Sequence, residues 1–77
     1  MELKSQELEL AVRLKQARLK AGLTQNQLAR RMGRPQSFIS KTETAERSPA
    51  FLEVVVLADL LGISIGDLIP RTLRKED

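Results

Sequence analysis

Two short helical patterns joined by a turn at Gly33 constrain the fold of this chain more than any other feature. Thr24 is followed three residues later by a glutamine, and this capping-box arrangement satisfies backbone N–H groups that a helix start leaves unpaired. Gly33 ends the first pattern, and Pro35 suits the start of the second because proline has no N–H to leave unpaired. We therefore expect helices over residues 25–32 and 36–43.

Three further helices are expected around this pair. Apolar residues recur on one side of a helical wheel from the N-terminus to Gly22, which predicts one long helix. Ser48 and Pro49 have the pattern of an N-cap followed by a proline at the first helical position, and a glycine stops that helix. Ser64, with an aspartate three residues later, caps a short last helix. The expected ranges are residues 5–20, 49–61 and 65–69.

The composition favours an all-α fold. Only Phe38 and Phe51 are aromatic, and aliphatic helices suit such a chain better than strands. Its 77 residues are enough for one domain, 1–77, in which residues 71–77 are expected to form a flexible tail. The first helix is expected to turn Leu3, Leu10, Leu14, Ala17 and Ala21 inward, and the fourth Phe51, Val54, Leu57, Ala58 and Leu61.

The absence of Cys and His excludes several kinds of site. The chain has no disulfide, thiol nucleophile, imidazole base or preferred zinc ligand, so no enzymatic activity, cofactor or metal is expected. The longest apolar run, residues 54–58, is too short to span a bilayer. The first residues are acidic where a secretory signal would be basic, so we expect a cytoplasmic protein with no membrane partner.

The net charge of +3 is distributed unevenly along the chain. Residues 13–47 hold nine basic and two acidic residues, a balance of +7, whereas residues 48–70 hold three acidic residues and none basic. Such separation is expected when one surface meets a polyanion, and it fits equally well with a basic face that is only solvated. The motif in residues 24–43 favours the first interpretation.

The spacing within residues 24–43 is that of a helix-turn-helix. Ala29, Gly33 and Ile39 lie at intervals of four and six residues, which supplies a small residue for close packing, a glycine in the turn and a branched anchor to the core. With GLTQ before it and ISKTE within it, the stretch resembles the Cro/CI repressor-type helix-turn-helix family, also called the XRE family. The resemblance covers residues 10–69, because SPAFLEVVVLADLLGISIGDLI is similar to the family's fourth and fifth helices.

The resemblance implies a five-helix, lambda-repressor-like DNA-binding domain with its third helix in the major groove of double-stranded DNA. Gln36, Ser37 and Lys41 occupy positions that usually read bases, and Ser40 is a weaker candidate. Their chemistry agrees, because glutamine can pair with adenine, lysine can donate to guanine and serine can bond to either. The alternative is a polar face that is only solvated. Phe38 is expected to be partly packed, and contact with a thymine methyl is the alternative.

The resemblance also assigns contacts with the DNA backbone. Gln25 and Asn26, at the start of the second helix, match positions that fasten a phosphate. Arg18 and Glu43 match a pair that joins the first helix to the third, with the arginine also facing the DNA; the alternative is two independent surface charges. The expected phosphate contacts are Gln25, Asn26, Arg18, Arg34 and Arg47, and the structural residues of the motif are Ala29, Gly33, Ile39 and Glu43.

Two positions depart from the family pattern. The family usually has a large apolar residue at Thr42 and a glycine at Ala45. Thr42 therefore predicts a weaker anchor at the end of the third helix. Ala45 predicts a turn that is less able to adopt a positive φ, which leaves the geometry near Arg47 open.

The fourth and first helices carry apolar residues on their outer sides as well. Most of these positions are polar in the family, and helices that are apolar nearly all round are expected to be covered. A homodimer is the simplest cover, since two-fold symmetry would place two recognition helices about one turn of DNA apart. The alternative is that the first helix folds back over the fourth within one chain. The residues concerned are Leu52, Val56 and Leu60, with Leu8, Val12 and Leu19 on the first helix.

The sequence thus predicts a sequence-specific transcriptional regulator, a repressor that binds an inverted repeat as a homodimer. A function of another class also fits, namely the antitoxin of a toxin–antitoxin pair whose apolar stripe covers the toxin. A third interpretation, the controller protein of a restriction-modification system, is a variant of the first. Gene context separates the three.

Overall fold

The structure, a computed structural model, describes residues 3–71 of the chain. Its helices are α1 (Leu3–Lys20), α2 (Gln25–Met32), α3 (Gln36–Glu43), α4 (Phe51–Leu61) and α5 (Ile65–Leu68). There is no strand in the described part, and the prediction of a five-helix, all-α fold is confirmed. Of the expected tail, residues 71–77, only Arg71 lies within the described residues. The side chain of Leu3 is also outside the described part.

The bounds of α2 and α3 are those predicted, because their end signals are local. Thr24 Oγ1 accepts the N–H of Gln27 at 3.0 Å, and the amide oxygen of Gln27 accepts the N–H of Thr24 at 2.9 Å. Gly33 ends α2 in the left-handed conformation, at a φ of 68°. Pro35 follows with an extended backbone and caps α3. The first helix starts at Leu3, two residues before its predicted start.

The predicted start of α4 is wrong by two residues. Ser48 and Pro49 precede the helix instead of opening it, and Ala50 is the capping residue. Glu53 Oε1 accepts the N–H of Ala50 at 2.8 Å, which is one half of a capping box, and the alanine has no side-chain oxygen to supply the other half. The last helix, α5, is one residue shorter than predicted, since Ile69 adopts the extended backbone that a following proline favours.

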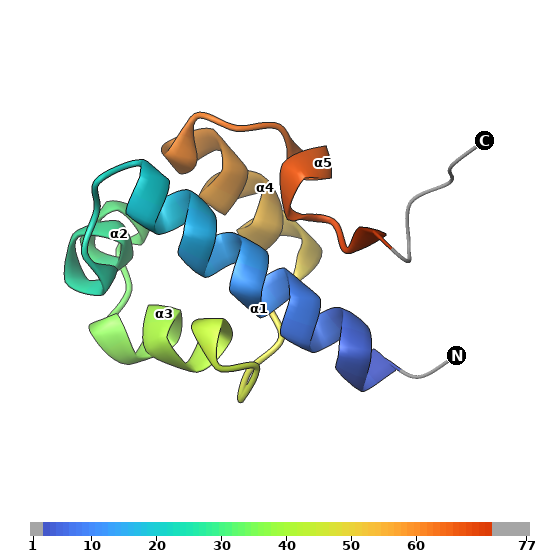
Figure 1. Cartoon of the computed structure of the whole chain (residues 1–77). Coiled ribbons are helices and arrows are strands. Elements are labelled where there is room, and N and C mark those ends of the chain that lie inside the picture. Colours follow the sequence, from blue (N-terminus) through green and yellow to red (C-terminus); the bar gives the residue numbers. More distant parts are fainter. Residues whose placement is uncertain (1–2, 72–77) are drawn as a thin grey trace.

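Each of the five helices contributes an almost fully buried leucine or isoleucine to a common core. α1 crosses the molecule between α3 on one side and α5 on the other, with α2 beside its C-terminal end (Figure 1). Burying one such side chain favours folding by about 1.5–3 kcal/mol, so every helix has a share in holding the others. The five residues are Leu14, Leu28, Ile39, Leu57 and Leu68.

Two residues expected in the core lie outside it. Ala21 is exposed, because it follows the last residue of α1. Phe51 is 71% exposed. It is the first residue of α4, and helical side chains tilt towards the N-terminus, so its ring lies beyond the end of the core. Ala11, which the pattern did not single out, is buried. The other expected members with described side chains are buried or packed against the core: Leu10, Leu14, Ala17, Val54, Leu57, Ala58 and Leu61.

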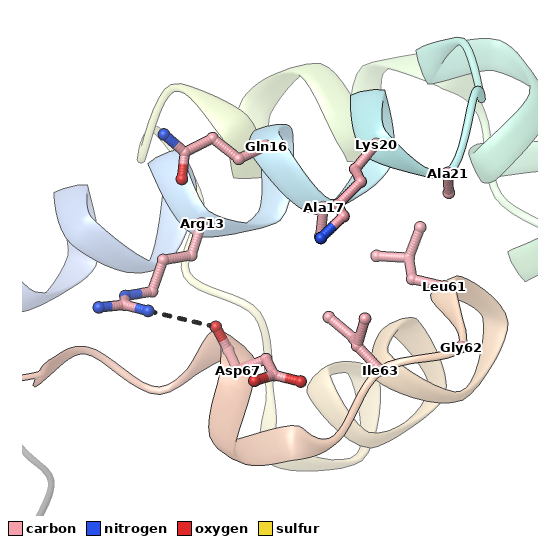
Figure 2. A pocket seen from close by; sticks show the side chains of 9 residues that line it. All are labelled: Arg13, Gln16, Ala17, Lys20, Ala21, Leu61, Gly62, Ile63 and Asp67. Atoms are coloured by element: carbon pink, nitrogen blue, oxygen red, sulfur yellow. Dashed lines mark hydrogen bonds between the residues drawn. The ribbon is translucent and has the colours of Figure 1, made fainter.

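A hollow of about 550 Å³ opens between α1 and the turn that joins α4 to α5 (Figure 2). Arg13 reaches across it, donating from Nη1 to the backbone oxygen of Asp67 at 3.4 Å and from Nε to Glu9 Oε2 at 2.9 Å. The same Glu9 oxygen accepts the N–H of Arg71 at 2.7 Å. These contacts fasten α5 and the residues after it to α1, so this side of the molecule serves the fold.

Candidate nucleic-acid interface

The outer side of α3 carries a row of polar side chains. Gln36, Ser37 and Lys41 are exposed, and Ser40 is half-buried, with its hydroxyl donating to the carbonyl of Ser37 at 3.3 Å. Ile39 lies on the opposite side and is fully buried. The four residues that the resemblance assigns to base reading therefore share one accessible side of the helix, which we call the α3 row. Their contacts with bases stay a prediction.

The turn between α2 and α3 sets the direction of this row. Ala29 is fully buried, and its carbonyl accepts the N–H of Arg34 at 2.9 Å, while the N–H of Gly33 donates to Arg30 at 3.0 Å. A Cβ added at Gly33 would meet no atom within 4 Å. Glycine is favoured there by the positive φ and not by lack of space.

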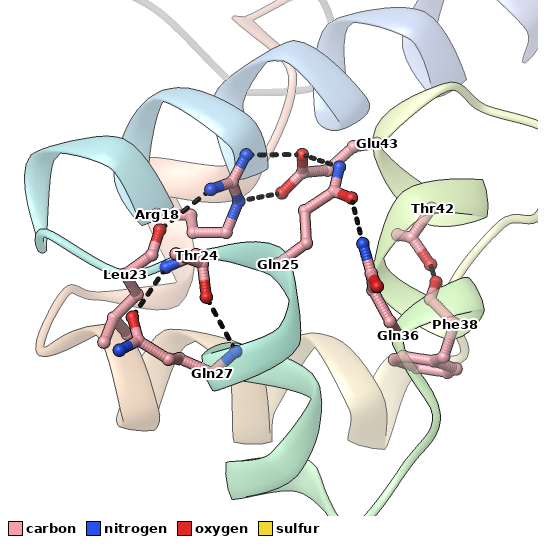
Figure 3. Close-up of polar contacts among 9 residues, drawn as sticks. All are labelled: Arg18, Leu23, Thr24, Gln25, Gln27, Gln36, Phe38, Thr42 and Glu43. Carbon is pink, nitrogen blue, oxygen red and sulfur yellow. Dashed lines mark hydrogen bonds and ion pairs between the residues drawn. The ribbon is translucent and has the colours of Figure 1, made fainter.

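On one flank of the α3 row, Arg18 and Glu43 form a buried pair (Figure 3). Arg18 donates from Nε to Glu43 Oε2 at 2.6 Å and from Nη2 to Oε1 at 3.0 Å, and its Nη1 donates to the carbonyl of Leu23 at 2.8 Å. The two side chains are only 6% and 2% exposed, so they are not the independent surface charges of the alternative interpretation. The pair ties α1 to the end of α3. A phosphate contact by Arg18 stays a prediction, although its guanidinium is already engaged.

Two glutamines extend this pair to the α3 row. Gln25 Nε2 donates to Glu43 Oε1 at 3.1 Å, and Gln36 Nε2 donates to Gln25 Oε1 at 3.3 Å (Figure 3). One hydrogen of the Gln36 amide nitrogen is left over together with its amide oxygen, which is what a bidentate contact to adenine needs. The side chain of Gln25 makes two hydrogen bonds within the protein, and one hydrogen of its amide nitrogen is left over. Asn26 is exposed beside it at the start of α2, and the phosphate contacts of both residues stay predictions.

On the α4 flank of the α3 row, an aromatic ring and a carboxylate gather two arginines. Phe38 is 6% exposed, and the guanidinium carbons of Arg34 and Arg47 lie 4.9 and 4.3 Å from its ring centroid. Glu53 Oε2 pairs with Nη2 of Arg47 at 2.9 Å and with Nη2 of Arg34 at 3.4 Å. The N–H of Ala50 and then the Arg47 guanidinium hold the pKa of Glu53 below its ordinary value, against the opposing effect of burial.

Glu53 is the residue of this flank that sequence reasoning missed. Arg34 and Arg47 were expected to contact phosphates, and the structure brings them together around Phe38. The available signal for Glu53 was local, because an acid three residues after a capping position is half of a capping box. Ser48 and Pro49 offered a competing signal.

The two departures from the family pattern have different outcomes. The expectation of a weak anchor at Thr42 is wrong, because this side chain is 2% exposed and its hydroxyl donates to the carbonyl of Phe38 at 2.6 Å. Ala45 adopts a φ of 64°, the one positive value outside glycine among residues 3–71. The turn forms with alanine, at a strain of about 1–2 kcal/mol, and the N–H of Arg47 then donates to Lys41 at 3.1 Å.

Residues 9–71 match the helix-turn-helix domain family. The chain belongs to this family. Because the match spans most of the chain and the fold agrees, the resemblance to XRE-type helix-turn-helix proteins is confirmed. The curated proteins contain no significant match.

Several solved structures share this helix-turn-helix fold. The restriction-modification controller protein C.AhdI from Aeromonas hydrophila is 25% identical, with a TM-score of 0.83 over 90% of this chain and 100% of C.AhdI. The DNA-binding domain of BldD is 19% identical and shows the fold alone, with a TM-score of 0.79 over 91% of this chain and 100% of that domain. HppE, solved with FeII and substrate, is 25% identical with a TM-score of 0.81, over 92% of this chain and 41% of HppE.

The family and the fold together make this chain a DNA-binding helix-turn-helix transcription regulator of the XRE type. None of the helices within residues 3–71 is long and apolar enough to cross a membrane.

Proposed function

We propose that the protein recognises a short inverted repeat in double-stranded DNA as a homodimer and represses transcription from the site. The observation that carries this proposal is the α3 row, which is an accessible polar side of a helix in a domain of this family. A carboxylate that is largely shielded from solvent holds an arginine on each flank of the row: Glu43 on one and Glu53 on the other. Each bidentate contact from such a row to a base discriminates against the wrong base by about 1–3 kcal/mol. The proposal includes no catalytic step.

The contacts with the DNA backbone would come from both flanks of the row. Arg34 and Arg47 lie on the α4 flank with side chains 48% and 35% exposed, and the start of α2 with Asn26 lies on the other. Arginines and helix N-termini are the usual partners of phosphate oxygens. Such contacts fix the register of the protein on the duplex, and the α3 row then supplies the sequence preference.

The homodimer part of the proposal rests on an exposed apolar patch on α4, made by Phe51, Leu52 and Val56. These side chains are 71%, 71% and 43% exposed. Large apolar side chains exposed together on one helix are typical of a surface that another protein chain covers. Leu60, also expected at the interface, is half-buried and packs against the core instead. A two-fold axis at the α4 patch would repeat the α3 row on the partner and match an inverted repeat.

The alternative in which α1 covers α4 within one chain is wrong. Leu52 stays 71% exposed, and α1 leaves its own outer residues open to solvent. These α1 residues form a second apolar surface, which can enlarge the dimer contact or serve another partner. They are Leu8, Val12 and Leu19, at 46%, 52% and 58% exposed.

Selection of binding sites from random DNA tests the DNA part of the proposal. An enriched inverted repeat is expected, with affinity that falls steeply as salt rises because phosphate contacts release counterions. Lys41→Ala should relax base preference at one position by about 1–3 kcal/mol, whereas Lys20→Ala, which removes the same charge at the hollow beside α5, should leave preference unchanged. Equal affinity for every duplex would contradict sequence-specific recognition.

Sedimentation of the free protein tests the dimer. Leu52→Glu buries a charge in the proposed contact and should shift the monomer–dimer equilibrium strongly towards monomer. Leu19→Glu is the matched variant on α1, and it should leave the equilibrium unchanged if the α4 patch alone forms the contact. A wild-type protein that stays monomeric at high micromolar concentration would refute the homodimer.

The similarity to C.AhdI favours one second candidate, a controller of restriction-modification genes. This candidate uses the same DNA face and differs in what is regulated. Restriction and methyltransferase genes beside this one would support it. A small toxin that co-purifies with the wild type and is lost on Leu52→Glu would instead identify an antitoxin.

A further inference from the structure

Glu53 lies behind the two arginines that flank the α3 row and contacts both of them. Its Oε2 atom pairs with Nη2 of Arg47 at 2.9 Å and Nη2 of Arg34 at 3.4 Å, while its Oε1 atom accepts the N–H of Ala50 at 2.8 Å. The glutamate side chain is only 13% exposed, against 35% and 48% for the arginines. One carboxylate, fixed to the first turn of α4, thus holds two cations that reach towards solvent.

The ring of Phe38 supplies the second surface that fixes these arginines. Both guanidinium groups lie over the ring, at 4.3 Å for Arg47 and 4.9 Å for Arg34. Nη1 of Arg47 is buried without a hydrogen-bond partner in the described structure. An unpaired buried donor costs free energy, and an arginine free to rotate would turn that nitrogen to water. The position of Arg47 is therefore imposed by Glu53 and Phe38.

The acid could also oppose DNA binding, because it cancels positive charge near a polyanion. Two features indicate that this loss of positive charge matters less than the positioning of the arginines. Two guanidinium groups share one carboxylate, so the cluster keeps a charge of +1. Glu53 contacts only Nη2 of each arginine, so the remaining N–H groups of the more exposed Arg34 stay available to a phosphate. Ordering the two side chains before binding removes an entropic cost that DNA would otherwise impose.

We propose that Glu53 is a positioning residue for DNA binding: it presents Arg34 and Arg47, stacked on Phe38, to phosphates beside the α3 row. This inference rests on the proposed function, since it concerns how the DNA face is held. It gives the α4 flank the same organisation as the other flank, where Glu43 holds Arg18 and Gln25.

The test is the affinity of the full chain for the duplex obtained by site selection, at fixed salt. Glu53→Gln should bind that duplex about five- to tenfold more weakly, although it raises the net charge by one. Asp59→Asn makes the same change of charge on the exposed side of α4 and should bind equally well or slightly more tightly. An equal or increased affinity of Glu53→Gln relative to Asp59→Asn would overturn the inference.

A double-mutant cycle separates positioning from a general effect on the fold. If Glu53 acts through Arg47, Glu53→Gln should weaken binding much less in an Arg47→Ala background than in the wild type. A purely structural role would give the same loss in both backgrounds and would overturn the inference. Urea unfolding of each variant verifies that the protein is folded under the binding conditions.

If Glu53→Gln does not fold, Arg47→Lys replaces it, because lysine keeps the charge but loses the planar stack on Phe38. Arg47→Lys should then weaken binding severalfold, whereas Arg30→Lys, on the exposed side of α2, should not. Equal affinities of these two variants would overturn the inference. A wild type that binds no selected duplex would refute the proposed function itself.

Discussion

Ala45 holds a backbone conformation that glycine would hold without strain. Its φ of 64° lies in the left-handed region, where a Cβ atom crowds the following carbonyl. We expect Ala45→Gly to stabilise the protein by about 0.5–1 kcal/mol, because the strain relieved exceeds the added entropy of the unfolded chain. Thermal unfolding should show a rise of a few degrees. Ala21→Gly, at an exposed position with an ordinary φ, is the control and should not stabilise.

The Arg18–Glu43 pair allows the stability of the fold to be separated from the geometry of the site. Glu43→Ala leaves the guanidinium buried and uncompensated, and should lower the free energy of unfolding by about 3–5 kcal/mol. The double variant Arg18→Met with Glu43→Leu replaces the pair by apolar side chains, and most of the lost stability should return. Its DNA affinity should stay low, because Gln25 no longer has the carboxylate that orients it and, through it, Gln36. Urea unfolding and DNA titration of the same samples check both parts, and full recovery of affinity would contradict the second.

The start of α2 depends on its capping box. Thr24→Ala removes the oxygen that accepts the N–H of Gln27 and should cost about 1 kcal/mol. Thr24→Ser keeps the hydroxyl and should retain most of the wild-type stability. Circular dichroism during heating measures both, and an unchanged melting temperature for Thr24→Ala would show that solvent replaces the cap without cost.

Helix bounds could be predicted from the sequence where the signals at the helix ends are local and unambiguous. The bounds of α2 and α3 follow from signals within a few residues of each end, and the sequence predicted both correctly. The start of α4 did not follow, because two local signals competed and the Glu53 cap prevailed over Ser48 and Pro49. The apolar pattern of α4 predicts a buried Phe51, but the core does not extend to the first residue of this helix, and Phe51 is exposed.

Contacts between elements were the harder part to predict. The Arg18–Glu43 pair could be anticipated only because a resemblance supplied it. The cluster of Arg34, Arg47 and Glu53 could not be, since tertiary packing brings the two arginines over one ring and Glu53 to both of them. Which polar residues of α3 share a side followed from helical spacing alone.

For the whole molecule, the absence of histidine determines how stability depends on pH. Histidine is the side chain whose unperturbed pKa lies between about pH 5 and 8, and the chain has none, so the urea midpoint should change little there. The pKa of Glu53 is lowered from 4.5, so its contribution to stability is complete above 4.5 and is lost as the pH falls through the lower folded-state value. Between pH 3 and 8 the urea midpoint should therefore decrease only at the acid end. The decrease should be smaller for Glu53→Gln than for the wild type. A midpoint that changes between pH 6 and 8 would contradict this account.

The core to which every helix contributes a buried leucine or isoleucine also decides how the molecule responds to heat. A domain this small with a single shared core unfolds in one cooperative step, so α3 cannot melt separately from α5 on the other side of α1. Occupancy of a DNA site then follows the folded fraction, and for a dimer its square. Defects at remote core positions such as Leu68 would thus behave genetically as temperature-sensitive loss of regulation, with every contact to DNA lost at the same temperature.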